Sequence, residues 1–370
     1  MRVLMSGGGT GGHVNPAIAI ANEIAKREPD SEIAFVGTER GIENRLVPKE
    51  GYKLYHIEIQ GIRRSLSLDN IKTLWLAAKS FAKCRRIIKE FKPDVVIGTG
   101  GYACWPVVRA AASMKIPTFL HESNAIPGFA VKMLEKQVDK VYVNFEETIA
   151  KLAVPEKAMR VGNPLKGGFI GADRDEAREK LGITGKYRTF LLSLGGSMGA
   201  ERVNQEVLEV MKEYTSKHPE VLHVHATGAI EYEETKAAFE KAGLDKCENI
   251  ELLEYVYDMP VRMAAADVVI NRAGAMTLSE LALLGRASIL IPSPNVTNNH
   301  QYKNAAVLRD AGAAMLLEEK ELAPGMLASK VRELCENREV RQKMQENIRK
   351  FAVENAAGLI YEDIKKLVRN

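Results

Sequence analysis

Short apolar runs alternate along the chain with longer segments in which apolar residues recur at helical spacing. The runs include RVLMS, EIAFVG and DVVIGTG in the first half, and TFLLSLGG, VLHVHATG and DVVINRAG in the second. Apolar strands separated by amphipathic helices are typical of βαβ units, whose parallel sheets are covered by helices on both faces. The pattern therefore predicts an α/β protein with doubly wound parallel sheets.

The pattern restarts near the middle of the chain. RVLMSGGGTGG at the start and TFLLSLGGSMGA at 189–200 both predict a strand, a glycine loop and a helix. Residues 160–183 lie between the two halves and are rich in Gly and Pro, as linkers are. We expect two Rossmann-like domains, 1–163 and 164–349, with a cleft between the carboxyl ends of their sheets. A polar helix at about 350–370 is expected to rejoin the first domain.

Composition narrows the class of protein. A chain of 370 residues that is 46% hydrophobic and 27% charged is typical of a globular protein with more than one core. The four cysteines are far apart, which argues against a disulfide framework or a zinc site and favours a reducing compartment. No signal peptide and no run of about 20 apolar residues is present. We therefore expect a cytoplasmic protein.

The opening loop, GGGTGG at 7–12, matches the glycine spacing of dinucleotide-binding proteins. That fingerprint also requires an acidic residue at the end of the second strand, where this chain has Gly and Thr at 37–38, so an NAD(P)-dependent oxidoreductase is disfavoured. Glycines and a following helix N-terminus still predict an anion site. His13 stands where the helix begins, and it is either a capping residue or a residue placed for proton transfer.

Five further stretches carry polar or glycine-rich sequence at predicted strand ends. They are GTGGYACWP (98–106), HESNAIPG (121–128), GGSMGA (195–200), NRAGAMTLSELALLG (271–285) and NNHQYKNA (298–305). With the opening loop, their order and separation resemble the MurG family of bacterial cell-wall glycosyltransferases over essentially the whole chain.

The resemblance implies the GT-B fold, in which two Rossmann-like domains face a cleft. It also implies inverting transfer of N-acetylglucosamine from UDP-N-acetylglucosamine to the 4-hydroxyl of an undecaprenyl-linked N-acetylmuramyl-pentapeptide, lipid I to lipid II, in peptidoglycan synthesis. A related UDP-sugar glycolipid synthase, a UDP-N-acetylglucosamine epimerase of the same fold and a binding-only protein remain alternatives.

The resemblance implies that the donor is bound mainly by the second domain. Glu280 would accept hydrogen bonds from the two ribose hydroxyls, and Ser197 would donate to the diphosphate. Val256 would meet the uracil, and Gln301 would hold the sugar hydroxyls. The other donor residues implied by the family pattern are Thr10, Gly11, Gly12, Asn124, Lys166, Ala275, Met276, Thr277, Leu278 and Ser279.

The same resemblance assigns the acceptor and the base to the first domain. His13 is the candidate base, with Glu122 as the alternative. The acceptor diphosphate would lie near Gly100, Gly101, Tyr102 and His121.

Three positions depart from the family pattern. Lys166 replaces a common Arg, keeping the charge but losing the planar fork that makes bidentate contacts. Met198 replaces a common Gln, and Asn15 replaces a frequent aromatic residue. None of these changes removes a group that the reaction needs.

Two patterns imitate metal sites. Asp173 and Asp175 match an Asp-x-Asp motif, but they open a helical run, where acidic residues favour the helix N-terminus. His223 and His225 share one face of a predicted strand and lack an evident third ligand. We expect no metal and no other cofactor.

The net charge of +4 is local in origin. Residues 61–92 hold nine Lys or Arg and two acidic residues, together with an apolar stripe at helical spacing. We favour docking on an anionic membrane, at the inner face of the cell membrane, over plain packing and over a nucleic-acid surface. The residues expected to contact the membrane are Lys72, Leu74, Trp75, Lys79, Phe81 and Lys83.

Overall fold

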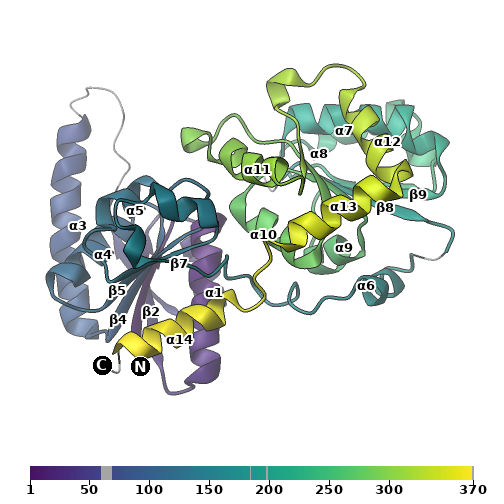
Figure 1. Ribbon diagram of the computed structural model, residues 1–370. Coiled ribbons are helices and arrows are strands. Elements are labelled where there is room, and N and C mark those ends of the chain that lie inside the picture. Colours follow the sequence, from purple (N-terminus) through teal and green to yellow (C-terminus); the bar gives the residue numbers. More distant parts are fainter. Residues whose placement is uncertain (60–68, 184, 197–198, 369–370) are drawn as a thin grey trace. The chain divides into compact units, whose positions relative to one another are not determined.

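The computed structural model describes residues 1–59, 69–183, 185–196 and 199–368, with the side chains of 69–75 and 77 excepted. The chain forms two compact units. The first contains Met1–Lys166 and Val353–Asn370, and the second contains Gly167–Ala352. Each unit is a parallel sheet flanked by helices (Figure 1). The prediction of two doubly wound parallel-sheet domains is therefore confirmed.

The first unit is built on the strands β1 (Arg2–Gly7), β2 (Glu32–Thr38), β3 (Lys53–Ile57), β4 (Val95–Gly100), β5 (Thr118–Glu122), β6 (Lys140–Val143) and β7 (Ala158–Arg160). Within the described residues they form one sheet in the order β3-β2-β1-β4-β5-β6-β7, and every neighbouring pair is parallel. The strand order changes direction between β1 and β4. In open parallel sheets, ligands bind outside the carboxyl ends of the strands at such a switch point.

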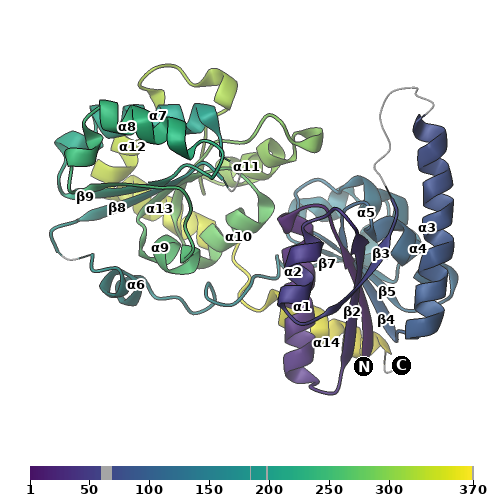
Figure 2. The same cartoon turned by 180° about the vertical axis from the view of Figure 1, so that it is seen from behind.

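Helices cover both faces of this sheet. They are α1 (Gly11–Arg27), α2 (Glu43–Lys49), α3 (Asp69–Phe91), α4 (Cys104–Ser113), α5 (Phe129–Leu134) and α14 (Ala356–Val368), with the 3-10 turns η1 (Glu146–Lys151) and η2 (Pro155–Lys157). Val3 and Met5 of β1 point into a core shared with α1 and α14, and Leu4 points into a core shared with α3 and α4. Figure 2 shows these two helical layers from behind. The alternation follows from the two-residue period of a strand.

The helix α14 brings the end of the chain back to the first unit. The Asp363 carboxylate accepts hydrogen bonds from Lys140 Nζ and from the Tyr142 hydroxyl, both at 2.9 Å. Tyr361 donates its hydroxyl to Glu28 at 2.9 Å. Ile360 and Ile364 are fully buried against the sheet. Apolar burial and these polar contacts together fix the helix to the first unit.

The second unit repeats this plan. Its strands are β8 (Thr189–Leu194), β9 (Val221–Ala226), β10 (Ile250–Leu253), β11 (Val268–Asn271), β12 (Ala287–Leu290) and β13 (Met315–Leu316), paired in parallel in the order β10-β9-β8-β11-β12-β13. Here the switch point lies between β8 and β11.

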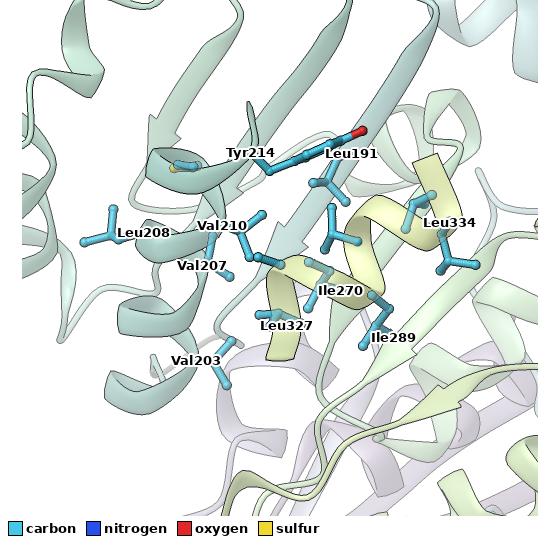
Figure 3. Close-up of a cluster of buried hydrophobic side chains, with 14 of the residues drawn as sticks. Leu191, Val203, Val207, Leu208, Val210, Tyr214, Ile270, Ile289, Leu327 and Leu334 are labelled. Carbon is cyan, nitrogen blue, oxygen red and sulfur yellow. The ribbon is translucent and has the colours of Figure 1, made fainter. Parts of the chain in front are cut away.

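The helices of the second unit are α6 (Arg174–Lys180), α7 (Glu201–Glu213), α8 (Tyr232–Lys241), α9 (Met259–Ala265), α10 (Ala275–Leu284), α11 (His300–Asp310), α12 (Met326–Glu336) and α13 (Arg338–Arg349), and its 3-10 turns are η3 (Thr215–Lys217), η4 (Leu244–Lys246), η5 (Thr297–Asn299) and η6 (Glu319–Glu321). Figure 3 shows the core in which Val203 and Val207 of α7 and Leu327 of α12 pack with Leu191 and Ile270 of the sheet.

The Asp173 to Asp175 pattern has the structural role expected of it. Asp173 caps α6, because its carboxylate accepts hydrogen bonds from the backbone N–H groups of Asp175 at 2.8 Å and Glu176 at 3.0 Å. Within the described part of the chain, no helix combines the length and the apolarity needed to cross a membrane.

Candidate active site

Two glycine loops of the first unit meet at its switch point. The loop after β1 and the loop after β4 come into backbone contact, since Gly8 N donates to Gly100 O at 3.3 Å. A Cβ atom on Gly101 would lie 2.2 Å from Gly8 O. No larger residue fits this approach, which explains why glycines occupy both loops. The structure thus brings together two motifs that the sequence analysis connected only through the family resemblance.

His13 lies at this junction, in the first turn of α1. Its Nδ1 is 3.2 Å from Gly8 O and 3.3 Å from Thr10 Oγ1. A carbonyl oxygen only accepts, so the hydrogen bond to Gly8 assigns the proton of the neutral ring to Nδ1 and the lone pair to Nε2. Thr99 Oγ1 also donates to the backbone carbonyl of His13 at 2.7 Å. The first glycine loop therefore orients the ring and sets Nε2 as its basic nitrogen, while Thr99 holds the backbone of His13.

A buried carboxylate that the sequence analysis did not identify holds the first glycine loop. Glu43 is 1% exposed and accepts hydrogen bonds from Gly9 N at 2.9 Å, Thr38 N at 2.8 Å and Thr38 Oγ1 at 2.9 Å. Burial raises the pKa of Glu43, but hydrogen bonds from Thr38 and Gly9 outweigh it and hold the pKa below its ordinary value. Because Glu43 comes 34 residues after Gly9, no local motif reveals the contact.

Glu122 organises the loop that follows β5. Its carboxylate accepts from Asn124 N at 2.9 Å, Asn124 Nδ2 at 3.0 Å and Gly128 N at 2.6 Å. Burial is the strongest influence and raises the pKa of Glu122 despite these hydrogen bonds. The contacts tie Glu122 to Asn124, a residue expected to contact the donor, and they all lie within one loop.

The other predicted acceptor residues differ in exposure. Tyr102 is 63% exposed, just beyond the second glycine loop. His121 is fully buried in β5, and its Nε2 donates to Gly162 O at 2.9 Å. Burial lowers the pKa of His121 to about 4, so the ring is neutral. The protein encloses the His121 ring completely. A contact between His121 and the acceptor stays a prediction.

The second unit also joins two glycine turns at its switch point. Gly195 follows β8, and a Cβ on it would lie 2.5 Å from Thr227 O, beyond the end of β9. A Cβ on Gly228 would lie 2.3 Å from Gly199 N. The sequence analysis did not assign the turn after β9, which contains Thr227 and Gly228, to the candidate site. Ser197 and Met198 lie outside the described residues.

The predicted ribose carboxylate lies on α10, which follows β11. Burial raises the pKa of Glu280 to about 7, although a hydrogen bond from Thr277 acts in the opposite direction. Ser279 Oγ donates to Ala275 O at 3.2 Å within the same helix. Ala275 and Leu278 are buried, while Met276 is partly exposed.

Two other predicted donor residues support loops of the second unit. Gln301 Oε1 accepts a hydrogen bond from Ser293 N at 2.9 Å and so connects α11 to the loop after β12. Val256 is 4% exposed and lies between Tyr255 and Tyr257, whose rings are 5.0 Å apart. Lys166 lies in the first unit, where its Nζ is 3.1 Å from Glu50 Oε1.

The segment predicted to dock on a membrane is only partly described. Residues 60–68 and the side chains of Lys72, Leu74 and Trp75 lie outside the described part. Lys79 forms an exposed ion pair with Glu58 at 2.8 Å, and Lys83 is partly exposed. Phe81 packs partly buried against the first core.

The two histidines of β9 belong to a buried polar network. Ser193 Oγ is 2.8 Å from His223 Nε2 and 2.9 Å from His225 Nδ1. Burial lowers the pKa of both rings, that of His225 to about 4, so both are neutral. Across the described residues, no group of three or more His, Cys, Asp or Glu side chains is placed to hold a metal ion. The absence of a required metal stays a prediction.

Comparison with known proteins agrees with this geometry. The chain is 45% identical, over 100% of its length and 99% of the relative, to the UDP-N-acetylglucosamine–N-acetylmuramyl-(pentapeptide) pyrophosphoryl-undecaprenol N-acetylglucosamine transferase of Acetivibrio thermocellus. It is 44% identical to the protein of the same name from Thermoanaerobacter pseudethanolicus, over 99% of this chain and 100% of the relative.

Solved structures and family models extend the comparison. The crystal structure of Acinetobacter baumannii MurG matches with a TM-score of 0.79 and 29% identity over 99% of both chains. A putative UDP-N-acetylglucosamine 2-epimerase from Listeria monocytogenes has a TM-score of 0.71 at 15% identity, over 98% of this chain and 95% of that one, which shows the fold alone. Residues 3–143 match the glycosyltransferase family 28 N-terminal domain, and residues 190–360 match its C-terminal domain. The chain is therefore a member of glycosyltransferase family 28.

Proposed function

We propose that this chain transfers N-acetylglucosamine from UDP-N-acetylglucosamine to an undecaprenyl-linked N-acetylmuramyl-pentapeptide, converting lipid I to lipid II in peptidoglycan synthesis. The observation that carries the proposal is 45% identity over the full chain to an enzyme named for this reaction. An epimerase is the second candidate because it shares the fold, but the epimerase from Listeria monocytogenes is only 15% identical to this chain.

His13 is the base in this proposal. The acceptor 4-hydroxyl attacks the anomeric carbon from the face opposite UDP, and its proton passes to His13 Nε2. The bond from the anomeric carbon to the diphosphate oxygen breaks, and UDP leaves with the electron pair. The Nδ1–H of His13 stays on Gly8 O, which stabilises the imidazolium that forms. Glu122 acts as a positioning residue, because its carboxylate binds N–H groups of its own loop.

The second unit binds the donor. Glu280 accepts hydrogen bonds from the ribose hydroxyls in its ionised form, so donor binding releases a proton at pH values near or below 7. The N–H group of Gly196 and the N-terminus of α10 stabilise the departing diphosphate, as fixed dipoles do without reorganisation. This proposal assigns the leaving-group charge to protein N–H groups and requires neither a metal nor another cofactor.

The acceptor places the reaction at the inner face of the cell membrane, where the chain would act as a peripheral protein. The support for this part of the proposal is the basic sequence of α3 and the lipid carrier in the relatives' name. We propose no nucleic-acid partner.

One assay tests the proposed function against its alternatives. The protein is incubated with labelled UDP-N-acetylglucosamine alone, with a lipid-linked muramyl-pentapeptide, and with other lipid acceptors. Transfer of label only when the acceptor is present supports the proposal. Isomerised sugar nucleotide without acceptor would identify an epimerase, transfer to a different glycolipid would identify a glycolipid synthase, and binding without turnover would leave a binding protein.

A further inference from the structure

The second unit has a cavity of about 780 Å³ at the edge of its sheet opposite the glycine turns. Thr189 and Val221, the first residues of β8 and β9, line it. Asp267 and Arg286, which directly precede β11 and β12, line it too. Because all strands of the sheet are parallel, their amino ends share one edge and the donor turns follow the other. The cavity is therefore distinct from the proposed donor site.

Arginine dominates the lining. Among the described residues around the cavity, six are arginines: Arg174, Arg188, Arg286, Arg338, Arg341 and Arg349.

Three carboxylates, those of Glu220, Asp267 and Glu336, are the only acidic groups among these lining residues. Asp267 is already shared, at 2.7 Å from Arg174 and 3.3 Å from Arg178. Within the described part of the chain, the other five lining arginines form no ion pair with a carboxylate within 4.0 Å. The cavity thus carries positive charge that the protein does not neutralise.

Burying the Arg286 guanidinium costs free energy. It is 5% exposed, and it donates to two carbonyls, from Nε to Leu284 O at 2.7 Å and from Nη1 to Ala266 O at 2.9 Å. Burial, followed by repulsion from Arg349, lowers the pKa of Arg286 to about 10. Attraction to the Asp267 and Asp173 carboxylates acts in the opposite direction but does not outweigh the burial, and a buried cation that is incompletely compensated is destabilising. An anion in the cavity would offset that cost.

Gly285 leaves room for the Arg349 guanidinium to approach Arg286. Its backbone has φ +64, at the C-terminus of α10, and a Cβ there would lie 2.3 Å from Arg349 Cζ. Any other residue would displace Arg349, which packs against Gly285 and beside Arg286. The backbone therefore holds two like charges together at one wall of the cavity.

We propose that this cavity, at the amino edge of the second sheet, binds a small polyanion that carries phosphate groups, such as a nucleoside polyphosphate. Guanidinium groups bind phosphate oxygens with two parallel hydrogen bonds, and several of them converge here. The volume falls within the range of roughly 300 to 1,000 Å³ that small-molecule sites occupy. A concave site between α6, α13 and the strand ends suits a free anion better than the flat surface of a bilayer.

Calorimetric titration of the full chain with inorganic pyrophosphate tests the proposal. Low ionic strength preserves charge interactions, and UDP is left out because its own diphosphate would compete for the cavity. We expect saturable binding that weakens about tenfold in the double variant Arg188→Gln/Arg338→Gln, since each substitution removes a guanidinium group that can donate to phosphate oxygens. Both side chains are exposed, so the variant is expected to fold.

Arg262→Gln is the matched control. It removes one arginine charge from α9, so it is matched to each of the single variants Arg188→Gln and Arg338→Gln, and Arg262 pairs with Glu251 and Asp258 outside the cavity. Pyrophosphate should bind this variant as it binds the original protein. Absence of saturable binding, unchanged binding in the double variant, or equal weakening by the control would overturn the proposal.

Anionic vesicles in place of pyrophosphate separate a free ligand from a lipid headgroup. If the original protein does not bind pyrophosphate and the double variant loses vesicle binding, the arginines form a lipid-binding surface and the proposal is wrong. If pyrophosphate binds and vesicle binding is equal in the two proteins, the free-anion site is supported.

Discussion

The imidazole ring of His13 lies against the backbone of Gly100, so closely that a Cβ atom on Gly100 would be 2.6 Å from His13 Cδ2 and 3.0 Å from Nε2. The two residues come from different glycine loops, and β1 and β4 bring them together at the switch point of the first sheet. The position of the proposed base therefore depends on the absence of a side chain at residue 100.

Gly100→Ala should displace the His13 ring and lower turnover by about tenfold or more, with UDP affinity little changed because the donor is assigned to the other unit. The matched control is Gly51→Ala. Both glycines have positive φ, +103 at Gly100 and +82 at Gly51, but nothing lies within 4 Å of a Cβ at Gly51. Steady-state kinetics of the two variants separate the effect of the clash with His13 from the effect of backbone strain. Equal losses of turnover in the two variants would refute the link to His13.

His13→Ala should lower turnover by roughly 10²-fold or more, as loss of a general base does, while donor affinity stays near its original value. Single-turnover rates and UDP titrations measure the two quantities. If the variant instead loses UDP binding and keeps a normal single-turnover rate, His13 is a capping or phosphate residue and Glu122 becomes the candidate base.

Glu43→Gln should destabilise the first glycine loop. The substitution removes a charged acceptor of three hydrogen bonds, at a cost of roughly 1.5 to 3 kcal/mol. Since the folded pKa of Glu43 lies below its ordinary value of 4.5, its contribution is present above that pH and is lost as pH falls below it. Denaturant unfolding between pH 3.5 and 7 should show a smaller pH dependence in the variant, and an unchanged dependence would contradict the assignment.

Glu280→Gln should weaken uridine binding about tenfold or more at pH 8 and remove its pH dependence near 7. The pKa of about 7 means that the original carboxylate becomes protonated as pH falls through 7, so affinity should fall in the same direction. Uridine lacks phosphate and does not add a phosphate titration of its own. A pH-independent affinity of the original protein between 6 and 8 would count against a ribose contact.

Replacing Lys72, Lys79 and Lys83 by Gln should reduce cosedimentation with anionic vesicles, with the largest effect at low salt. Activity on a soluble, short-chain acceptor analogue should remain. If vesicle binding persists while that activity collapses, these lysines belong to the acceptor site and the docking hypothesis is wrong.

The sequence by itself determined that the chain forms two α/β units with parallel sheets, and it marked the buried strands at their centres. Apolar strands alternating with helical patterns are a local signal, and burial on both faces of a parallel sheet is what such strands require. The Asp173 cap was likewise readable, because a capping carboxylate binds N–H groups only two and three residues away. The family motifs marked the strand ends where the candidate site lies.

Only the tertiary structure decided which of these groups meet. Glu43 reaches Gly9, His13 rests on Gly100, and Gly195 touches Thr227, although each pair is far apart in the chain. The arginine cavity is assembled in the same way, from positions between 174 and 349. Such contacts depend on strand order and on the close approach of packed backbones, and these are fixed by long-range burial that no local residue pattern encodes.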